Sequence, residues 1–280
     1  MKYLTLIRPK QWYKNLLVFL PLVFSGNLLN SLAVSNSILA FVSFCALSSA
    51  TYVINDYADR HKDRLHPEKR NRPIASGKIG TIEAMAITLL LLAVGFGIAL
   101  LLPINFLYAA LGYFVLSQLY TMWLKHEAFA DILTISTNFV IRAAAGAFAI
   151  SVWVSPWLIV CVFFLALFLM LGKRKSELAL LNEKAGFQRK TLNSYSPEVV
   201  SALSTIATTA LVISYTLYVF FGEHNLLYIN LPIALYAIFR YEAMISSANK
   251  ISRQPEYVFT DAKMLAAMLL WAIITIAILY

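Results

Sequence analysis

Three carboxylates and an amide follow directly after a long apolar stretch of the chain. The apolar run ends at residue 54, and Asn55, Asp56, Asp59 and Asp63 come within the next nine residues. On one continuous helix, the spacing i, i+3, i+7 places the three carboxylates on a single face. Carboxylates this close repel one another unless a cation lies between them, and Mg²⁺ prefers hard oxygen ligands together with substrate phosphates. We therefore expect a Mg²⁺–diphosphate site here, with the three aspartates as catalytic residues and all four side chains as metal ligands.

A basic segment follows the acidic one. Seven Lys and Arg side chains lie between residues 60 and 78, and two prolines and a glycine over 64–77 indicate an ordered loop rather than a helix. Cationic side chains form charge-assisted hydrogen bonds with phosphate oxygens, so Lys62, Arg70 and Arg72 are candidate substrate contacts. The alternative is that these charges only orient the loop at the membrane.

Two other charged segments lie at the ends of apolar runs. Residues 8–15, RPKQWYKN, precede the first run, and Lys14 and Asn15 either contact phosphate or belong to an interfacial anchor. Residues 172–177, GKRKSE, follow the sixth run, where Lys173 and Arg174 are candidate phosphate donors and Glu177 is a candidate second acidic group. Near the last run, Thr260 or Asp261 is placed to cap a helix.

A further candidate group surrounds the fifth apolar run. Lys125 lies before this run, Asp131 lies near its start, and Arg142 lies well within it. An arginine within a membrane span is costly and suggests a functional site. Arg142 lies about three helical turns beyond Asp131, so both side chains can face one substrate cavity. The alternative is a buried structural ion pair between them.

The composition is that of an all-α, polytopic membrane protein. The chain is 60% hydrophobic and 13% charged, with a mean hydropathy of +0.71, whereas soluble domains carry roughly 25% charged residues. A membrane helix needs about 20 apolar residues, and nine runs qualify. They are residues 15–32, 36–55, 81–102, 104–124, 129–150, 155–173, 198–221, 226–245 and 262–280. These runs occupy most of the chain, so we expect one transmembrane domain over 1–280.

The basic residues define an orientation for these spans. The chain has 23 Lys and Arg residues, and one of them, Arg142, lies well inside a span. The others lie before the first span, or in the loops after the second, fourth, sixth and eighth spans and at the adjoining span ends. The positive-inside rule then predicts a cytoplasmic N-terminus, a cytoplasmic site and an outward C-terminus. The net charge of +9 reflects this orientation and anionic lipid headgroups, and no nucleic-acid partner is expected. A transporter would be expected to have polar groups through the full depth of the spans, which this sequence lacks.

The acidic segment, NDxxDxxxD at 55–63, resembles the signature of the UbiA superfamily of intramembrane prenyltransferases. Further similar segments extend along most of the chain, at residues 8–15, 64–77, 120–125, 142–146, 172–174 and 255–261. The RPxQWxKN start and the GKR segment are similar to the branch of that superfamily that transfers phosphoribose to a polyprenyl phosphate.

This resemblance implies a nine-helix bundle around a cytoplasm-facing cavity and a Mg²⁺-dependent reaction. Phosphoribosyl diphosphate would donate 5-phosphoribose to a polyprenyl phosphate within the lipid bilayer, giving polyprenyl-phosphoryl-5-phosphoribose and diphosphate. The alternative is a conventional prenyltransferase that moves a prenyl group to an aromatic or other acceptor. Aromatic prenyltransferases carry a second acidic DxxxD segment after the sixth span, where this chain has mainly basic residues. That difference favours a donor and an acceptor that together carry more negative charge than one metal ion can offset, as phosphoribosyl diphosphate and a polyprenyl phosphate do.

Overall fold

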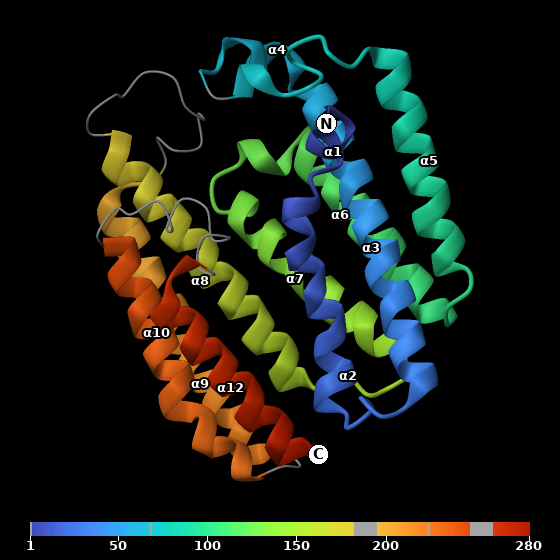
Figure 1. Cartoon of the computed structure of the whole chain (residues 1–280). Coiled ribbons are helices and arrows are strands. Elements are labelled where there is room, and N and C mark those ends of the chain that lie inside the picture. The colour runs from blue at the N-terminus through green and yellow to red at the C-terminus, as the bar shows by residue number, and fades with distance from the viewer. Residues whose placement is uncertain (1, 68, 182–194, 223–224, 247–259) are drawn as a thin grey trace. The chain divides into compact units, whose positions relative to one another are not determined.

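The computed structural model describes residues 2–67, 69–181, 195–222, 225–246 and 260–280, and these form helices and turns without any strand (Figure 1). The all-α prediction is therefore confirmed for this part of the chain. The chain divides into two compact units. One comprises residues 1–125 and 138–154, and the other comprises residues 126–137 and 155–280. Helix α7 (Ala130–Ala149) contributes residues to both units.

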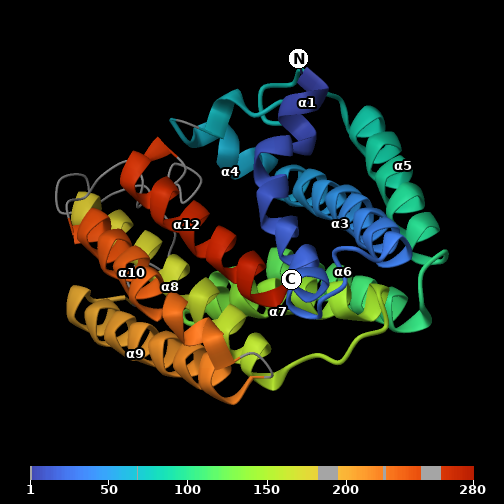
Figure 2. The same cartoon turned by 60° about the horizontal axis from the view of Figure 1, so that its bottom comes forward.

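Helix α3 (Ser31–Ala58) is the central element of the first unit. Its first turn is capped by Asn30, whose side-chain oxygen accepts hydrogen bonds from two backbone amides of that turn. Small side chains let α3 approach α5 (Thr81–Ala99) closely, and the two helices run side by side (Figure 2). A Cβ atom on Gly95 would lie 2.7 Å from the Leu47 side chain, and Ser43 Oγ donates to the Gly95 carbonyl at 2.8 Å. Such close contact is typical of helix pairs that pack through small residues in membranes.

The segment before α3 is not one regular α-helix. A short helix α1 (Lys2–Ile7) is followed by the 3-10 helix η1 (Pro9–Phe19) and by α2 (Leu20–Phe24). Helix η1 packs tightly on the second half of α7, since a Cβ atom on Gly146 would lie 2.0 Å from the Val18 carbonyl oxygen. The first unit is completed by α6 (Ile104–Met122) and the 3-10 helix η3 (Leu124–His126).

The acidic segment lies at the break between α3 and α4 (Arg60–Leu65). The expectation of one continuous helix through the three aspartates is wrong, because α3 ends at Ala58 and Asp59 has a non-helical backbone, with φ −89° and ψ 1°. Backbone bonds from the Asp59 amide to the Asn55 carbonyl and from the Asp63 amide to the Asp59 carbonyl keep the chain turning across the break. The loop after α4 contains the 3-10 turn η2 (Lys69–Asn71), as the prolines and glycine predict.

The second unit contains α8 (Pro156–Leu181), α9 (Pro197–Phe221), the 3-10 helix η5 (Asn225–Asn230), α10 (Leu231–Ser246) and α12 (Ala262–Leu279). Gly172 allows α8 and α10 to meet, since a Cβ atom there would lie 2.4 Å from the Ile245 side chain. The predicted cap on the last helix is Asp261, which accepts from the Met264 amide at 2.7 Å. Residues 255–259 of the family-like segment lie outside the described residues.

Six of the described helices are long and apolar enough to cross a membrane: α3, α5, α7, α8, α9 and α12. The chain is therefore a multi-pass membrane protein. The other three predicted spans coincide with η1 and α2, with α6 and with α10, which has 16 residues. The count of nine spans thus stays a prediction.

Candidate active site

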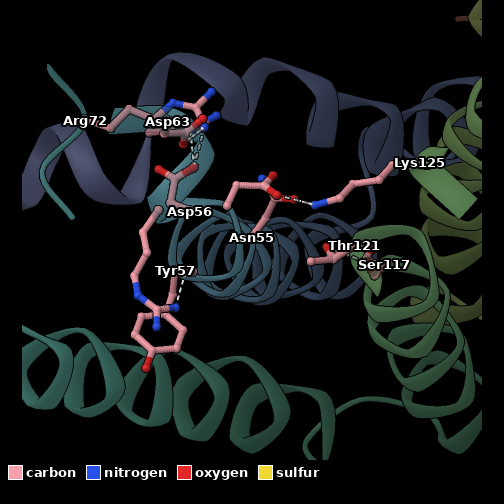
Figure 3. A network of polar contacts seen from close by, with 11 residues as sticks. Asn55, Asp56, Tyr57, Asp63, Arg72, Ser117, Thr121 and Lys125 are labelled. Atoms are coloured by element: carbon pink, nitrogen blue, oxygen red, sulfur yellow. Dashed lines mark hydrogen bonds and ion pairs between the residues drawn. The ribbon is translucent and has the colours of Figure 1, made fainter. Parts of the chain in front are cut away.

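Two aspartates from the acidic segment converge on one arginine. Arg72 Nη1 lies 3.0 Å from Asp56 Oδ1 and 2.7 Å from Asp63 Oδ2 (Figure 3). The Asp56 and Asp63 side chains are only 2% and 6% exposed, whereas the Arg72 side chain is 25% exposed. A carboxylate buried this deeply requires a cation or several donors. The structure thus brings together three of the residues that the sequence selected.

Arg8 is a site residue that the sequence interpretation missed. Its Nη2 atom lies 2.6 Å from the same Oδ1 atom of Asp56 that Arg72 contacts, and its guanidinium lies over the Tyr52 ring. The Arg8 backbone is left-handed, with φ 52°, a conformation that is uncommon for residues other than glycine. Strained backbone of this kind tends to occur at functional sites. Its place at the start of the family-like segment 8–15, directly before a proline, was the sequence signal that could have indicated it.

The Arg8 backbone is fixed by its neighbours. Leu6 is fully buried in an apolar cluster with Val53 and Ile74. Ser49 of α3 donates its hydroxyl to the Ile7 carbonyl at 2.8 Å and accepts from Trp12 Nε1 at 3.0 Å. These contacts explain how a strained residue is held beside Asp56.

The third aspartate has a different cation. Lys125, from η3, lies 2.7 Å from Asp59 Oδ1 and 3.5 Å from Asn55 Oδ1, and its ammonium group points towards Asn55 (Figure 3). In this pair the cation is more buried than the acid, since the Lys125 side chain is 9% exposed and the Asp59 side chain is 21% exposed. In the Arg72 pairs the acids are the more buried partners. The four predicted metal ligands are therefore divided into two pairs: Asp56 and Asp63 contact arginines, whereas Asn55 and Asp59 contact Lys125.

The donor set fits a hard divalent cation at the Asp56–Asp63 pair. Two carboxylate oxygens lie within 3.0 Å of one cationic nitrogen, so the position between them already accommodates positive charge. Oxygen ligands of this kind are those that Mg²⁺ prefers. Among the described residues, no group of three His, Cys, Asp or Glu side chains is gathered closely enough to hold a metal. The remaining ligands would have to come from water or substrate.

Asn15 and Arg142 belong to a buried network of the first unit. Asn15 Oδ1 accepts from Arg142 Nε at 2.8 Å, and Arg142 also donates to the Tyr113 hydroxyl at 3.0 Å and to the Asn138 carbonyl at 2.9 Å. Arg142 is 4% exposed and Asn15 is fully buried. The predicted alternative of a structural pair between Arg142 and Asp131 is not found, because Asp131 has other partners.

Asp131 is the centre of a separate network in the second unit. Its carboxylate accepts from Arg174 Nη2 at 2.6 Å, from the Tyr195 hydroxyl at 2.7 Å and from the Ile132 amide at 2.8 Å. Arg174 also pairs with Glu177 at 2.5 Å. Burial and the hydrogen bond to Asp131 raise the pKa of Tyr195, so its hydroxyl remains a proton donor. Arg174 and Glu177, predicted as substrate contacts, are thus engaged with the protein itself.

The remaining predicted site residues are four cations, Lys14, Lys62, Arg70 and Lys173. Lys62 and Arg70 are exposed on α4 and η2. Lys14 is half-buried beside the Tyr13 ring, and Lys173 is half-buried on α8 next to Arg174. Neither Lys62 nor Arg70 forms a described ion pair with Asp56, Asp59 or Asp63.

The described residues thus form a multi-pass helical protein with paired acidic and basic side chains at the end of one helix. The UbiA prenyltransferase family matches residues 17–273 of the chain. The chain therefore belongs to the UbiA prenyltransferase family.

Several curated relatives are described as decaprenyl-phosphate phosphoribosyltransferases. The decaprenyl-phosphate phosphoribosyltransferase of Corynebacterium glutamicum is 37% identical over 232 residues, covering 78% of this chain and 68% of that protein. The protein of the same description from Mycolicibacterium smegmatis is 37% identical over 218 residues, covering 76% and 69%. The resemblance deduced from the short motifs is thereby confirmed.

Solved structures share the fold. A UbiA homologue from Archaeoglobus fulgidus, whose structure holds DMAPP and Mg²⁺, superposes with a TM-score of 0.78 at 22% identity, covering 99% of this chain and all of that chain. The UbiA-type architecture is thereby confirmed.

Proposed function

We propose that this protein transfers 5-phosphoribose from phosphoribosyl diphosphate to a polyprenyl phosphate, releasing diphosphate. The observation that carries the proposal is the convergence of Asp56 and Asp63 on one cationic nitrogen, in a chain whose curated relatives are described as decaprenyl-phosphate phosphoribosyltransferases. An acidic pair beside partly exposed cations suits a metal-bound diphosphate leaving group.

The acidic side chains would hold Mg²⁺, with Asp56 and Asp63 as the central ligands and Asn55 and Asp59 as further oxygen donors. When bound, Mg²⁺ neutralises the negative charge that develops on the leaving diphosphate. Arg8, Arg72 and Lys125 lie within hydrogen-bonding distance of these carboxylates, so they can donate to phosphate oxygens beside the same ligands.

The reaction needs little acid–base chemistry from the protein. The acceptor is already an anionic phosphate, and the ribose carbon develops positive charge as its bond to the diphosphate breaks. Fixed cations and carboxylates around the reacting groups therefore supply most of the stabilisation. This agrees with a site made of paired charges.

Further substrate contacts are proposed at the charged residues that the sequence selected. Lys62, Arg70 and Lys14 would bind phosphate from the surrounding segments, and Lys173 would do so from α8. Asn15 and Arg142 would act from their buried network, whereas the network of Asp131, Arg174 and Glu177 would support Lys173 on α8 without contacting the substrate. The polyprenyl tail would lie along apolar helices, within the bilayer.

We also propose that both compact units form one catalytic domain with nine membrane-crossing segments. The family match extends over residues of both units, which supports a single functional domain. The distribution of Lys and Arg supports a cytoplasmic N-terminus and site and an outward C-terminus.

The test uses purified protein in detergent with Mg²⁺, labelled phosphoribosyl diphosphate and polyprenyl phosphate. We expect organic-extractable label to appear, and to be lost in Asp63→Asn. The absence of transfer, together with turnover of a prenyl diphosphate and an aromatic acceptor, would assign the protein to the conventional prenyl-transfer branch instead. Polyprenyl phosphate of another length serves as a control for substrate choice.

A further inference from the structure

The charges of the candidate site cancel within the protein itself. Three carboxylates, Asp56, Asp59 and Asp63, are paired with three cations, Arg8, Arg72 and Lys125. A divalent cation bound between Asp56 Oδ1 and Asp63 Oδ2 would compete with the guanidinium groups that contact these two oxygens. This competition is a property of the chain's own side chains.

We infer that Arg8 and Arg72 are exchange residues, which neutralise Asp56 and Asp63 in the resting protein and transfer to the diphosphate when the metal site fills. The inference rests on the metal–diphosphate site of the proposed function and adds an order of events to it. Arg8 and Arg72 thereby make metal binding and diphosphate binding depend on each other.

The burial of the two partners supports an exchange at this pair. The Arg8 and Arg72 side chains are each 25% exposed, whereas the Asp56 side chain is 2% exposed. The carboxylate is therefore the fixed member, and the guanidinium groups reach it from the more open side. The guanidinium group is therefore the member of each pair that can change partners. The contacts that fix Leu6 and Ile7 hold the Arg8 backbone in place.

Lys125 does not fit the same role. It is more buried than Asp59, the acid with which it pairs, so the carboxylate is the more accessible member. Lys125 is better suited to remain in place and to contact phosphate from there. The exchange is therefore assigned to the two arginines alone.

The energetic argument is one of linked binding. A guanidinium displaced from a buried carboxylate needs a new anionic partner, because an uncompensated charge near the protein interior is costly. A diphosphate provides that partner through charge-assisted hydrogen bonds. Binding of the metal then favours binding of diphosphate, and by thermodynamic linkage the reverse holds equally.

The test measures binding rather than turnover. Mn²⁺ is titrated into the purified full chain in detergent without any phosphate, and the loss of the free-ion EPR signal gives the bound fraction. In Arg72→Gln, which removes the competing cation, we expect Mn²⁺ to bind about tenfold more tightly than in the wild type, the change typical of one neighbouring charge. Labelled inorganic diphosphate, measured with Mg²⁺ present, should bind about tenfold more weakly to the same variant.

Opposite changes in the two affinities distinguish exchange from other roles. An arginine with only a structural role would weaken both affinities when replaced, and one that only binds phosphate would leave the Mn²⁺ affinity unchanged. Either result would overturn the inference. Lys78→Gln, which removes an exposed positive charge from the same loop, is the matched control and should change neither affinity appreciably.

A second variant protects the test against misfolding. Arg8→Gln removes the other guanidinium from the same Asp56 oxygen, so it should change both affinities in the same directions as Arg72→Gln. The Mn²⁺ titration contains neither a phosphoribosyl nor a prenyl substrate. Its failure would therefore refute the exchange while leaving the phosphoribosyl-transfer assay free to succeed or fail separately.

Discussion

Two acidic centres of this protein use the same residue types in different ways. Asp56 in the first unit is paired with two arginines whose side chains are each 25% exposed. Asp131 in the second unit is fully buried, and its partner Arg174 is 5% exposed. Asp131 also accepts from Tyr195 and from its own following amide. The accessibility of the cation, rather than the presence of an ion pair, separates an exchangeable site from a structural one.

The largest effect is expected on turnover at the first centre. Asp56→Asn keeps the side-chain volume but removes the charge that pairs with Arg8 and Arg72, so transfer should fall at least about a hundredfold. The free energy of unfolding should fall by about 1 kcal/mol or less, because both arginines can reach solvent. Transfer rates and chemical unfolding in detergent measure the two quantities. A variant that unfolds readily would show that Asp56 is structural.

The second centre should show the opposite pattern. Asp131→Asn leaves the buried Arg174 with Glu177 as its remaining described carboxylate, and we expect the free energy of unfolding to fall by about 3 kcal/mol. Denaturant unfolding followed by tryptophan fluorescence measures this loss. Unchanged stability with abolished transfer would place Asp131 among the substrate contacts and remove the contrast between the two centres.

A smaller effect is expected from the hydroxyl that supports Asp131. Tyr195→Phe removes the donor to Asp131 and the acceptor for the Phe129 amide, which should lower the free energy of unfolding by about 1–2 kcal/mol. Tyr108→Phe, an exposed tyrosine of α6, is the matched control and should change stability little. Equal effects in the two variants would argue against a supporting role for Tyr195.

The smallest effect concerns pH at the last helix. Hydrogen bonds from Arg240, together with one from the Met264 amide, lower the pKa of Asp261 from its ordinary value of 3.8 to about 2. Since the folded pKa is depressed, the stabilisation is present above pH 4 and is lost as the pH falls through 2. The difference in melting temperature between the wild type and Asp261→Asn should therefore shrink as the pH is lowered from 5 towards 2.5. A constant difference would contradict this assignment.

Several features of the fold follow from local sequence alone. Apolar runs of membrane length predicted the long helices, and Asp261 was a predicted cap because a side-chain oxygen before a helix satisfies free backbone amides. The short motifs of residues 8–15, 55–63 and 172–174 placed the chain in its superfamily. Such features depend on composition and on neighbours within a few residues, so the sequence contains them in full.

The partners of the charged residues were decided by tertiary structure. Arg8 reaches Asp56 across 48 positions, and Lys125 reaches Asp59 across 66. Arg142 meets Asn15 across 127 positions, although the sequence also allowed Asp131 on the same helix. The break at Asp59 was likewise invisible in the spacing of the aspartates.

The sequence by itself determined the membrane class, the helical architecture, the superfamily and the set of charged residues available for chemistry. Only the tertiary structure decided which cation neutralises which carboxylate, and which member of each pair is accessible. The physical reason is that several of these charges have partners in distant segments of the chain, which local sequence does not specify. Those partners are selected by helix packing, which fixes distance and burial together, and these two quantities set the energy of an ion pair.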